Sequence, residues 1–213
     1  MRLSLFILVI LLFACNNQDN NKSIADTFVT QQDTLIKKDE PAVITNDSTV
    51  LNQLASTILK SCKEKDFTLL SSFIHPVAGL RFSPYAYVDT IAHQRLSAQA
   101  LRNLASSKQK IKWGFFDGSG DTILLDLAGY FNRFVYDKDF MAAPKRSLNK
   151  ILGGGNSLNN LNKIYPGCDF MEFYFPGTNP KYGGMDWKTL RLVFKKEKDK
   201  TWLVGIIHDE WTI

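Results

Sequence analysis

Glu172 is the acidic residue whose surroundings most favour chemistry, because it lies within the aromatic run 170–175 (FMEFYF). A carboxylate in such a strand has little water around it and needs a partner. Arg191, in the equally apolar run 190–194 (LRLVF), is the predicted partner if the two strands pair. Such a pair is either a structural ion pair or a group that contacts a ligand or exchanges a proton. The sequence leaves both interpretations open.

The triplet His208-Asp209-Glu210 offers side chains of the metal-ligand type near the end of the chain. Strand alternation places His208 and Glu210 on one face and Asp209 on the other. Two ligands do not make a zinc site, so His75 or His93 would have to supply a third. No metal site is therefore predicted.

Other motifs that carry chemistry are incomplete. The turn 117–121 (DGSGD) spaces its oxygens as a calcium loop does, but the glycine and the closing glutamate of an EF-hand are missing. Residues 153–157 (GGGNS) lack the Gly-Lys-Ser/Thr ending of a phosphate-binding loop, and no Gly-x-Ser-x-Gly elbow presents a nucleophile. No cofactor is predicted. For an enzyme, the weak catalytic candidates are Glu172, Asp117 and His208.

Several aromatic residues join a large apolar body to a polar tip, and they either fill a core or line an open pocket. In the second case a sugar or another amphipathic ligand would fit, oriented by charged side chains. The candidate ligand-binding residues are Arg81, Tyr85, Tyr87, Trp113, Tyr136, Glu172, Tyr174, Arg191, His208 and Trp211.

The elements that must position these residues follow from periodicity. A helix with one apolar face is predicted from Asp47-Ser48, and Asp66, Ser97 and Asp126 are predicted helix caps. Residues 137–166 are expected to be irregular. Strands are predicted at 110–116 and, as a C-terminal antiparallel meander, at 168–175, 187–196 and 201–213.

The predicted fold class is α+β, with N-terminal helices packed on a curved antiparallel sheet. This order of elements resembles the cone-shaped NTF2-like or cystatin-like domains. Strings such as 81–85 (RFSPY), 182–187 (YGGMDW) and 204–209 (VGIIHD) resemble an uncharacterised family of exported bacterial proteins over most of residues 50–213. That resemblance implies no activity and transfers no functional residue.

The N-terminus carries Arg2, an apolar run over 3–13 that is too short to span a bilayer, and then Leu12-Phe13-Ala14-Cys15. This pattern resembles the lipobox of bacterial lipoprotein precursors, which implies cleavage before Cys15 and lipid attachment to its thiol. Two or more acyl chains hold a protein stably to a membrane. Asn16 lacks the charge associated with inner-membrane retention, so the expected location is exported, at the outer membrane facing the periplasm or the cell surface.

Three segments are predicted: a signal peptide at 1–14, the lipidated cysteine with a flexible polar tether at 15–49, and one globular domain at 50–213. The domain contains 22 Lys plus Arg and 15 Asp plus Glu, a net charge of +7. Behind a lipobox, this charge favours acidic envelope partners and not nucleic acid. Cys62 and Cys168 could form a disulfide or stay buried thiols.

The expected function is a lipid-anchored cell-envelope protein that binds a small ligand, a glycan or a protein partner without catalysis. Two alternatives stay open. One is a small cofactor-independent hydrolase or isomerase with a pocket on the concave face of the sheet. The other is a structural or assembly lipoprotein.

Overall fold

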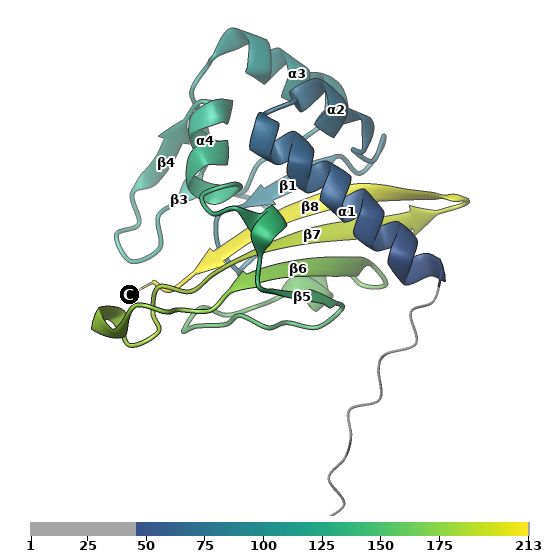
Figure 1. The fold of residues 1–213 in the computed structure, drawn as a ribbon. Coiled ribbons are helices and arrows are strands. Elements are labelled where there is room, and N and C mark those ends of the chain that lie inside the picture. Colours follow the sequence, from purple (N-terminus) through teal and green to yellow (C-terminus); the bar gives the residue numbers. More distant parts are fainter. Residues whose placement is uncertain (1–45, 213) are drawn as a thin grey trace, which may run out of the picture. The chain divides into compact units, whose positions relative to one another are not determined.

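The computed structural model describes residues 46–212, which form an α+β unit as predicted (Figure 1). The helices are α1 (Asn46–Glu64), α2 (Phe67–Ser72), α3 (Ala98–Ser107), α4 (Leu127–Phe134) and α5 (Leu161–Ile164), with the 3-10 helices η1 (Phe140–Ala142) and η2 (Pro180–Tyr182). The strands are β1 (Leu80–Ser83), β2 (Arg95–Leu96), β3 (Ile111–Phe115), β4 (Thr122–Leu125), β5 (Lys145–Leu148), β6 (Asp169–Phe175), β7 (Lys188–Glu197) and β8 (Lys200–Glu210).

The main sheet has six strands in the order β2-β1-β8-β7-β6-β5. The C-terminal meander β6-β7-β8 is confirmed, with Glu172 paired to Arg191 and Arg191 to Ile207. The sheet is not wholly antiparallel, because β1 pairs with β8 in parallel. β5, inside the segment expected to be irregular, adds the far edge strand by pairing with β6.

Helices cover one face of the sheet and enclose the larger core. α1 contributes its predicted apolar stripe, including Ala55, Ile58 and Cys62, which packs in one cluster with Phe173 and Leu192 from the strands. The exposed positions between these residues are polar, so burying this stripe is what fixes the helix on the sheet.

The predicted caps are confirmed. The side chains of Asp66, Ser97 and Asp126 accept hydrogen bonds from the backbone N–H groups three residues later, at 2.9, 3.1 and 2.7 Å. Each cap satisfies one of the free N–H donors at a helix start.

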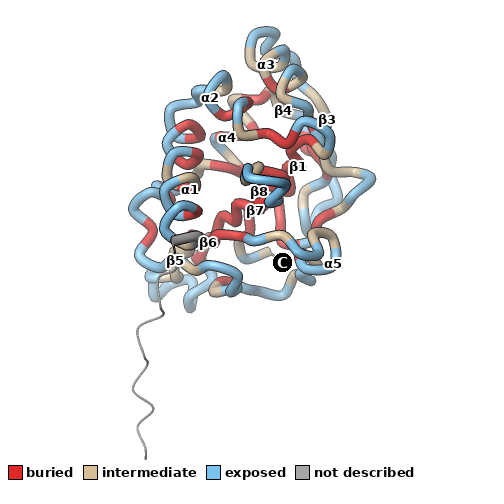
Figure 2. The backbone as a smooth tube through the Cα atoms, turned by 90° about the vertical axis from the view of Figure 1, so that its right-hand side faces the viewer, coloured by how far each residue is buried: buried red, intermediate tan, exposed pale blue. Residues whose placement is uncertain are grey.

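The opposite face of the sheet is covered too. α5 and its neighbours pack Leu161 and Tyr165 against Phe170, Val193 and Ile207. Figure 2 shows α1 and α5 on opposite sides of the buried strands. Both faces of the sheet therefore carry covering elements over these strands.

The limits of the unit differ from the predicted tether boundary, because α1 begins at Asn46 and includes the last four residues assigned to the tether. The lipobox, Cys15 and residues 16–45 lie outside the described residues. Within residues 46–212 no helix is long and apolar enough to cross a membrane. Cys62 and Cys168 are both free thiols, and Cys62 is buried as its helix position indicates.

Candidate functional site

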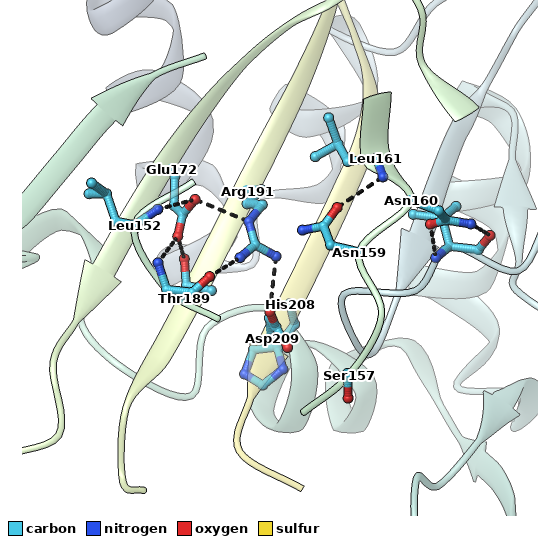
Figure 3. Close-up of polar contacts among 12 residues, drawn as sticks. Leu152, Ser157, Asn159, Asn160, Leu161, Glu172, Thr189, Arg191, His208 and Asp209 are labelled. Atoms are coloured by element: carbon cyan, nitrogen blue, oxygen red, sulfur yellow. Dashed lines mark hydrogen bonds and ion pairs between the residues drawn. The ribbon is translucent and has the colours of Figure 1, made fainter. Parts of the chain in front are cut away.

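The predicted Glu172–Arg191 pair exists, and it is fully buried (Figure 3). Arg191 donates from Nε to Glu172 at 3.1 Å, from one terminal nitrogen to Asp209 at 3.1 Å, and from the other to the carbonyl of Gly153 at 2.7 Å. All three charged side chains project from the face of the sheet that α5 covers. Each nitrogen of the guanidinium therefore donates to a protein acceptor.

Residues of the loop between β5 and α5 close over the Glu172 carboxylate. Its two oxygens accept hydrogen bonds from the backbone N–H groups of Leu152 (3.2 Å) and Gly153 (2.8 Å) and from the Thr189 hydroxyl (2.9 Å). A Cβ at Gly153 would come within 2.8 Å of the Tyr174 ring, so the loop needs glycine to approach this closely. Glu172 and Arg191 thus hold the loop to the sheet and do not reach a surface where a ligand could contact them. Of the two interpretations that the sequence left open, the structural ion pair is the one that fits.

A second charged cluster lies on the other face of the sheet, which α1 covers. Asp137, His208 and Glu210 place ligand-type atoms within 4.8 Å of one another. The Lys188 ammonium binds both carboxylates, at 2.8 Å from Glu210 and at close range from Asp137. Arg133 donates to Glu210 at 2.5 Å. Because Lys188 occupies the position between the acids, the cluster is an ion-pair network.

The pKa of Asp137 agrees with the assignment of this cluster as an ion-pair network. Burial raises its pKa, but the hydrogen bonds and charges of His208 and Lys188 together outweigh burial and lower the pKa to about 2. His208 is fully buried, with Nδ1 at 3.1 Å from the Pro84 carbonyl oxygen and Nε2 at 3.3 Å from Asp137. His208 is therefore an interior group.

The residue that joins His208 and Glu210 is Asp137, which sequence reasoning missed. His75 lies elsewhere, 2.6 Å from Glu197, and His93 belongs to a different site. Only the pairing of distant segments brings Asp137 to β8, so strand alternation could not have indicated it.

Three predicted residues do meet at one cavity of about 580 Å³. Tyr85, Tyr87 and Asp117 line it, together with residues that the sequence did not single out. These are Asp89, Ala92, His93, Phe115, Phe116, Asn156, Ser157 and Leu158. The volume lies within the range of small-molecule sites.

His93 is a neutral hydrogen-bond donor at this cavity. Its Nδ1 accepts from the backbone N–H of Asp89 at 3.1 Å and faces the Ser83 hydroxyl at 3.0 Å, which places the ring proton on Nε2. Burial lowers the pKa of His93 to about 4, the nearby Asp89 raises it and Arg81 lowers it further. Nε2 has no partner among the described residues.

Gly114 allows the imidazole to sit at the cavity wall. Its φ of +141° is one that other residues rarely adopt, and a Cβ there would lie 3.0 Å from Cδ2 of His93. The register of β3 against β4 shifts between Lys112 and Phe115, so this position is a local irregularity of the hairpin.

Asp117 stands at the rim and ties three segments together. Its carboxylate accepts from the hydroxyls of Thr212 (2.6 Å) and Ser157 (3.1 Å), and the Asn156 side-chain amide donates to the Thr212 carbonyl at 2.7 Å. The β3–β4 turn, the loop before α5 and the C-terminal segment thereby form one wall.

The remaining predicted residues do not line this cavity. Arg81 donates to the carbonyls of Asp89, Thr90 and His93, so it holds the loop that carries His93. Trp113, expected as a ligand contact, is fully buried and stacks on Tyr130 with ring centroids 4.0 Å apart.

Tyr136 donates to Asp139 at 2.5 Å, away from the cavity lining. Tyr174 packs 6.4 Å from Trp187, and Trp211 is partly exposed. Of the ten ligand-binding candidates, the structure brings Tyr85 and Tyr87 to one cavity, and Asp117 is the one catalytic candidate that joins them.

Comparison of the chain with known protein families, with curated proteins and with solved structures found no match.

Proposed function

We propose that this domain binds a small uncharged amphipathic ligand, best a sugar, in the cavity around Tyr87 and His93. One observation carries the proposal: half-exposed aromatic faces and fixed polar groups line the same cavity. Tyr87 is 51% exposed and Phe115 43% exposed, so both rings are available to stack on a ligand. Aromatic surface with a few fixed polar groups is the usual composition of such sites.

The charges of the cavity favour a neutral, hydroxyl-rich ligand. No Lys or Arg lines it, which disfavours an anion. The carboxylates of Asp89 and Asp117 already accept hydrogen bonds and keep acceptor capacity for ligand hydroxyls, while His93 offers a neutral N–H donor.

Binding without turnover is better supported than a hydrolase or isomerase activity. The catalytic candidates Glu172 and His208 are fully buried and bonded to protein groups, and Asp117 is engaged by two hydroxyls. Acid–base catalysis needs a group within reach of the proton it transfers. We therefore assign Asp117 to shaping the rim.

A protein partner at the same opening is a second candidate. Leu158, which lines the cavity, is 78% exposed, and Ile91, next in sequence to the lining residue Ala92, is 95% exposed. Apolar side chains grouped in this way occur at interaction sites. Binding of a partner would be impaired by Ile91→Asp, whereas a sugar site would respond mainly to Tyr87.

The N-terminal pattern supports a lipoprotein that displays this domain at the cell envelope. A Cys15→Ala variant is expected to stay unprocessed or to leave the membrane fraction, as measured by fractionation and mass spectrometry. A processed variant that stays membrane-bound like the wild type would refute the anchor. The helix-then-sheet order further supports a fold of the NTF2-like or cystatin-like kind.

The binding proposal is tested with a panel of defined neutral and acidic oligosaccharides, with affinity measured by calorimetry. We expect a neutral sugar to bind the wild type and Tyr87→Ala to weaken binding at least about fivefold, since stacking on one aromatic ring is worth on the order of 1 kcal/mol or more. Tyr182→Ala is the matched control, because Tyr182 is 52% exposed and does not line the cavity. Equal effects of the two substitutions would overturn the assignment.

A further inference from the structure

A second, smaller cavity lies on the face of the sheet that α5 covers, over β1, β7 and β8. It has a volume of about 300 Å³ and an apolar floor that includes Ala78 and Val204. Its polar side chains include Arg81, Arg95 and Lys195. No Asp or Glu lines it, in contrast to the Tyr87–His93 cavity.

The two arginines stand directly opposite each other in the sheet. Arg81 on β1 pairs in register with Arg95 on β2, and like charges at such a position destabilise a strand pair. Arg95 is exposed and makes no ion pair within the described residues, whereas Arg81 is partly offset by the charge of Asp89.

The third cation is only weakly neutralised. Lys195 lies 3.4 Å from Glu197, and both side chains are nearly half exposed. Glu197 also binds His75 at 2.6 Å, so its charge is shared. Exposed pairs of this kind contribute little and exchange readily with other partners.

A buried phenol adds a neutral donor. Tyr165 lies over Gly205, where an added Cβ would come within 3.0 Å of its oxygen. This hydroxyl is buried and has no hydrogen-bond partner of good geometry among the described residues, and the Arg81 side chain lies near it. Burial raises the pKa of Tyr165 to about 12, although Arg81 lowers it, so the phenol keeps its proton at neutral pH.

We propose that this cavity binds a phosphate group, carried by a small molecule or by a phospholipid headgroup. The Arg81 guanidinium is held in place by three backbone carbonyls, which positions a cation before the ligand arrives. Arginine forks match the geometry of phosphate oxygens, and Lys195 adds a point charge. A phosphate between Arg81 and Arg95 converts their repulsion into two attractive contacts. This site is separate from the proposed sugar site and does not depend on it.

The test uses the full-length protein in a non-ionic detergent and two soluble probes at matched ionic strength. Inorganic phosphate represents the free ligand, and glycerophosphoglycerol represents a phospholipid headgroup. Calorimetry is expected to show saturable binding of at least one probe, and the tighter one identifies the source. Arg95→Ala/Lys195→Ala should weaken binding at least about tenfold, the loss expected for one or more charge-assisted hydrogen bonds.

Lys145→Ala/Lys181→Ala is the matched control, since it removes the same charge from exposed positions outside the cavity. Tyr165→Phe should weaken binding several-fold without lowering the melting temperature measured without phosphate. The proposal is overturned if neither probe binds, or if the control pair loses as much affinity as Arg95→Ala/Lys195→Ala.

Discussion

Replacing Arg191 by methionine tests the interior network most directly. Methionine keeps most of the side-chain length but removes the three hydrogen bonds that the guanidinium donates. The carboxylates of Glu172 and Asp209 then remain buried beside each other without a cation, and the Gly153 carbonyl loses its partner. Removing one partner of a buried ion pair typically costs about 3–5 kcal/mol.

The structure also predicts an order among neighbouring substitutions. In Glu172→Gln the new amide group must face donors in either orientation, because each carboxylate oxygen accepts two hydrogen bonds. We therefore expect a cost of about 2–3 kcal/mol.

Asp209→Asn should cost less, about 1 kcal/mol. One oxygen of Asp209 has no hydrogen-bond partner. Burial raises the pKa of Asp209 against the opposing charge of Arg191. Since the network holds two acids and one arginine, removing the Asp209 charge leaves a neutral Glu172–Arg191 pair.

Urea unfolding followed by circular dichroism measures these differences. For a unit of this size the Arg191→Met loss corresponds to a fall in melting temperature of roughly 6–20 °C. The denaturation midpoint should fall most for Arg191→Met, less for Glu172→Gln and least for Asp209→Asn, with an unchanged slope. If Asp209→Asn destabilised the protein as much as Arg191→Met, the account of the network would be wrong. Folded Glu172→Gln should bind sugar like the wild type, because Glu172 does not line the cavity.

Two further predictions concern the cavities. Because the folded state holds His93 neutral with a pKa of about 4, whereas the unfolded chain protonates near pH 6.5, the stability due to His93 is complete above pH 6.5 and is lost as the pH falls to 4. The loss should be about 3 kcal/mol and should shrink in His93→Gln, as measured by urea unfolding across this range; an unchanged pH profile in the variant would contradict it. Gly205→Ala places a methyl group 3.0 Å from the Tyr165 oxygen and should cost about 1–3 kcal/mol, and Tyr165→Phe should restore part of it; a double variant no more stable than Gly205→Ala would show that the contact is not the cause.

Local patterns predicted much of the fold. Each helix cap needs a side chain next to the helix it starts, so Asp66, Ser97 and Asp126 were identifiable from neighbouring residues alone. The β7–β8 turn at residues 198–199 was equally local. The parallel β1–β8 pair was not, because it joins segments more than 100 residues apart and leaves no periodic signal.

The charged residues also divide into those that a local pattern predicts and those that it does not. The Glu172–Arg191 pair was predictable because an acid and a base each interrupted an apolar strand. Asp137 was not, because its partners Lys188 and His208 come from distant segments. His93 was not, because the cavity it lines also takes residues from 115–117 and 156–158. Trp113 was misassigned since its polar tip is satisfied by the Leu125 carbonyl at 2.9 Å, which lets the whole ring enter the core.

The position of β8 in the sheet has a consequence for how the molecule assembles. β8 is the last strand along the chain, yet it lies between β7 and β1. During synthesis, β1 and β2 therefore have no sheet to join until residues near Glu210 have emerged. Until then β1 can form only its pairing with β2, and completing the sheet depends on contacts of long sequence separation, which form slowly. The six-stranded sheet of the newly made chain should thus be completed only at the end of elongation, when β8 joins β1 to β7.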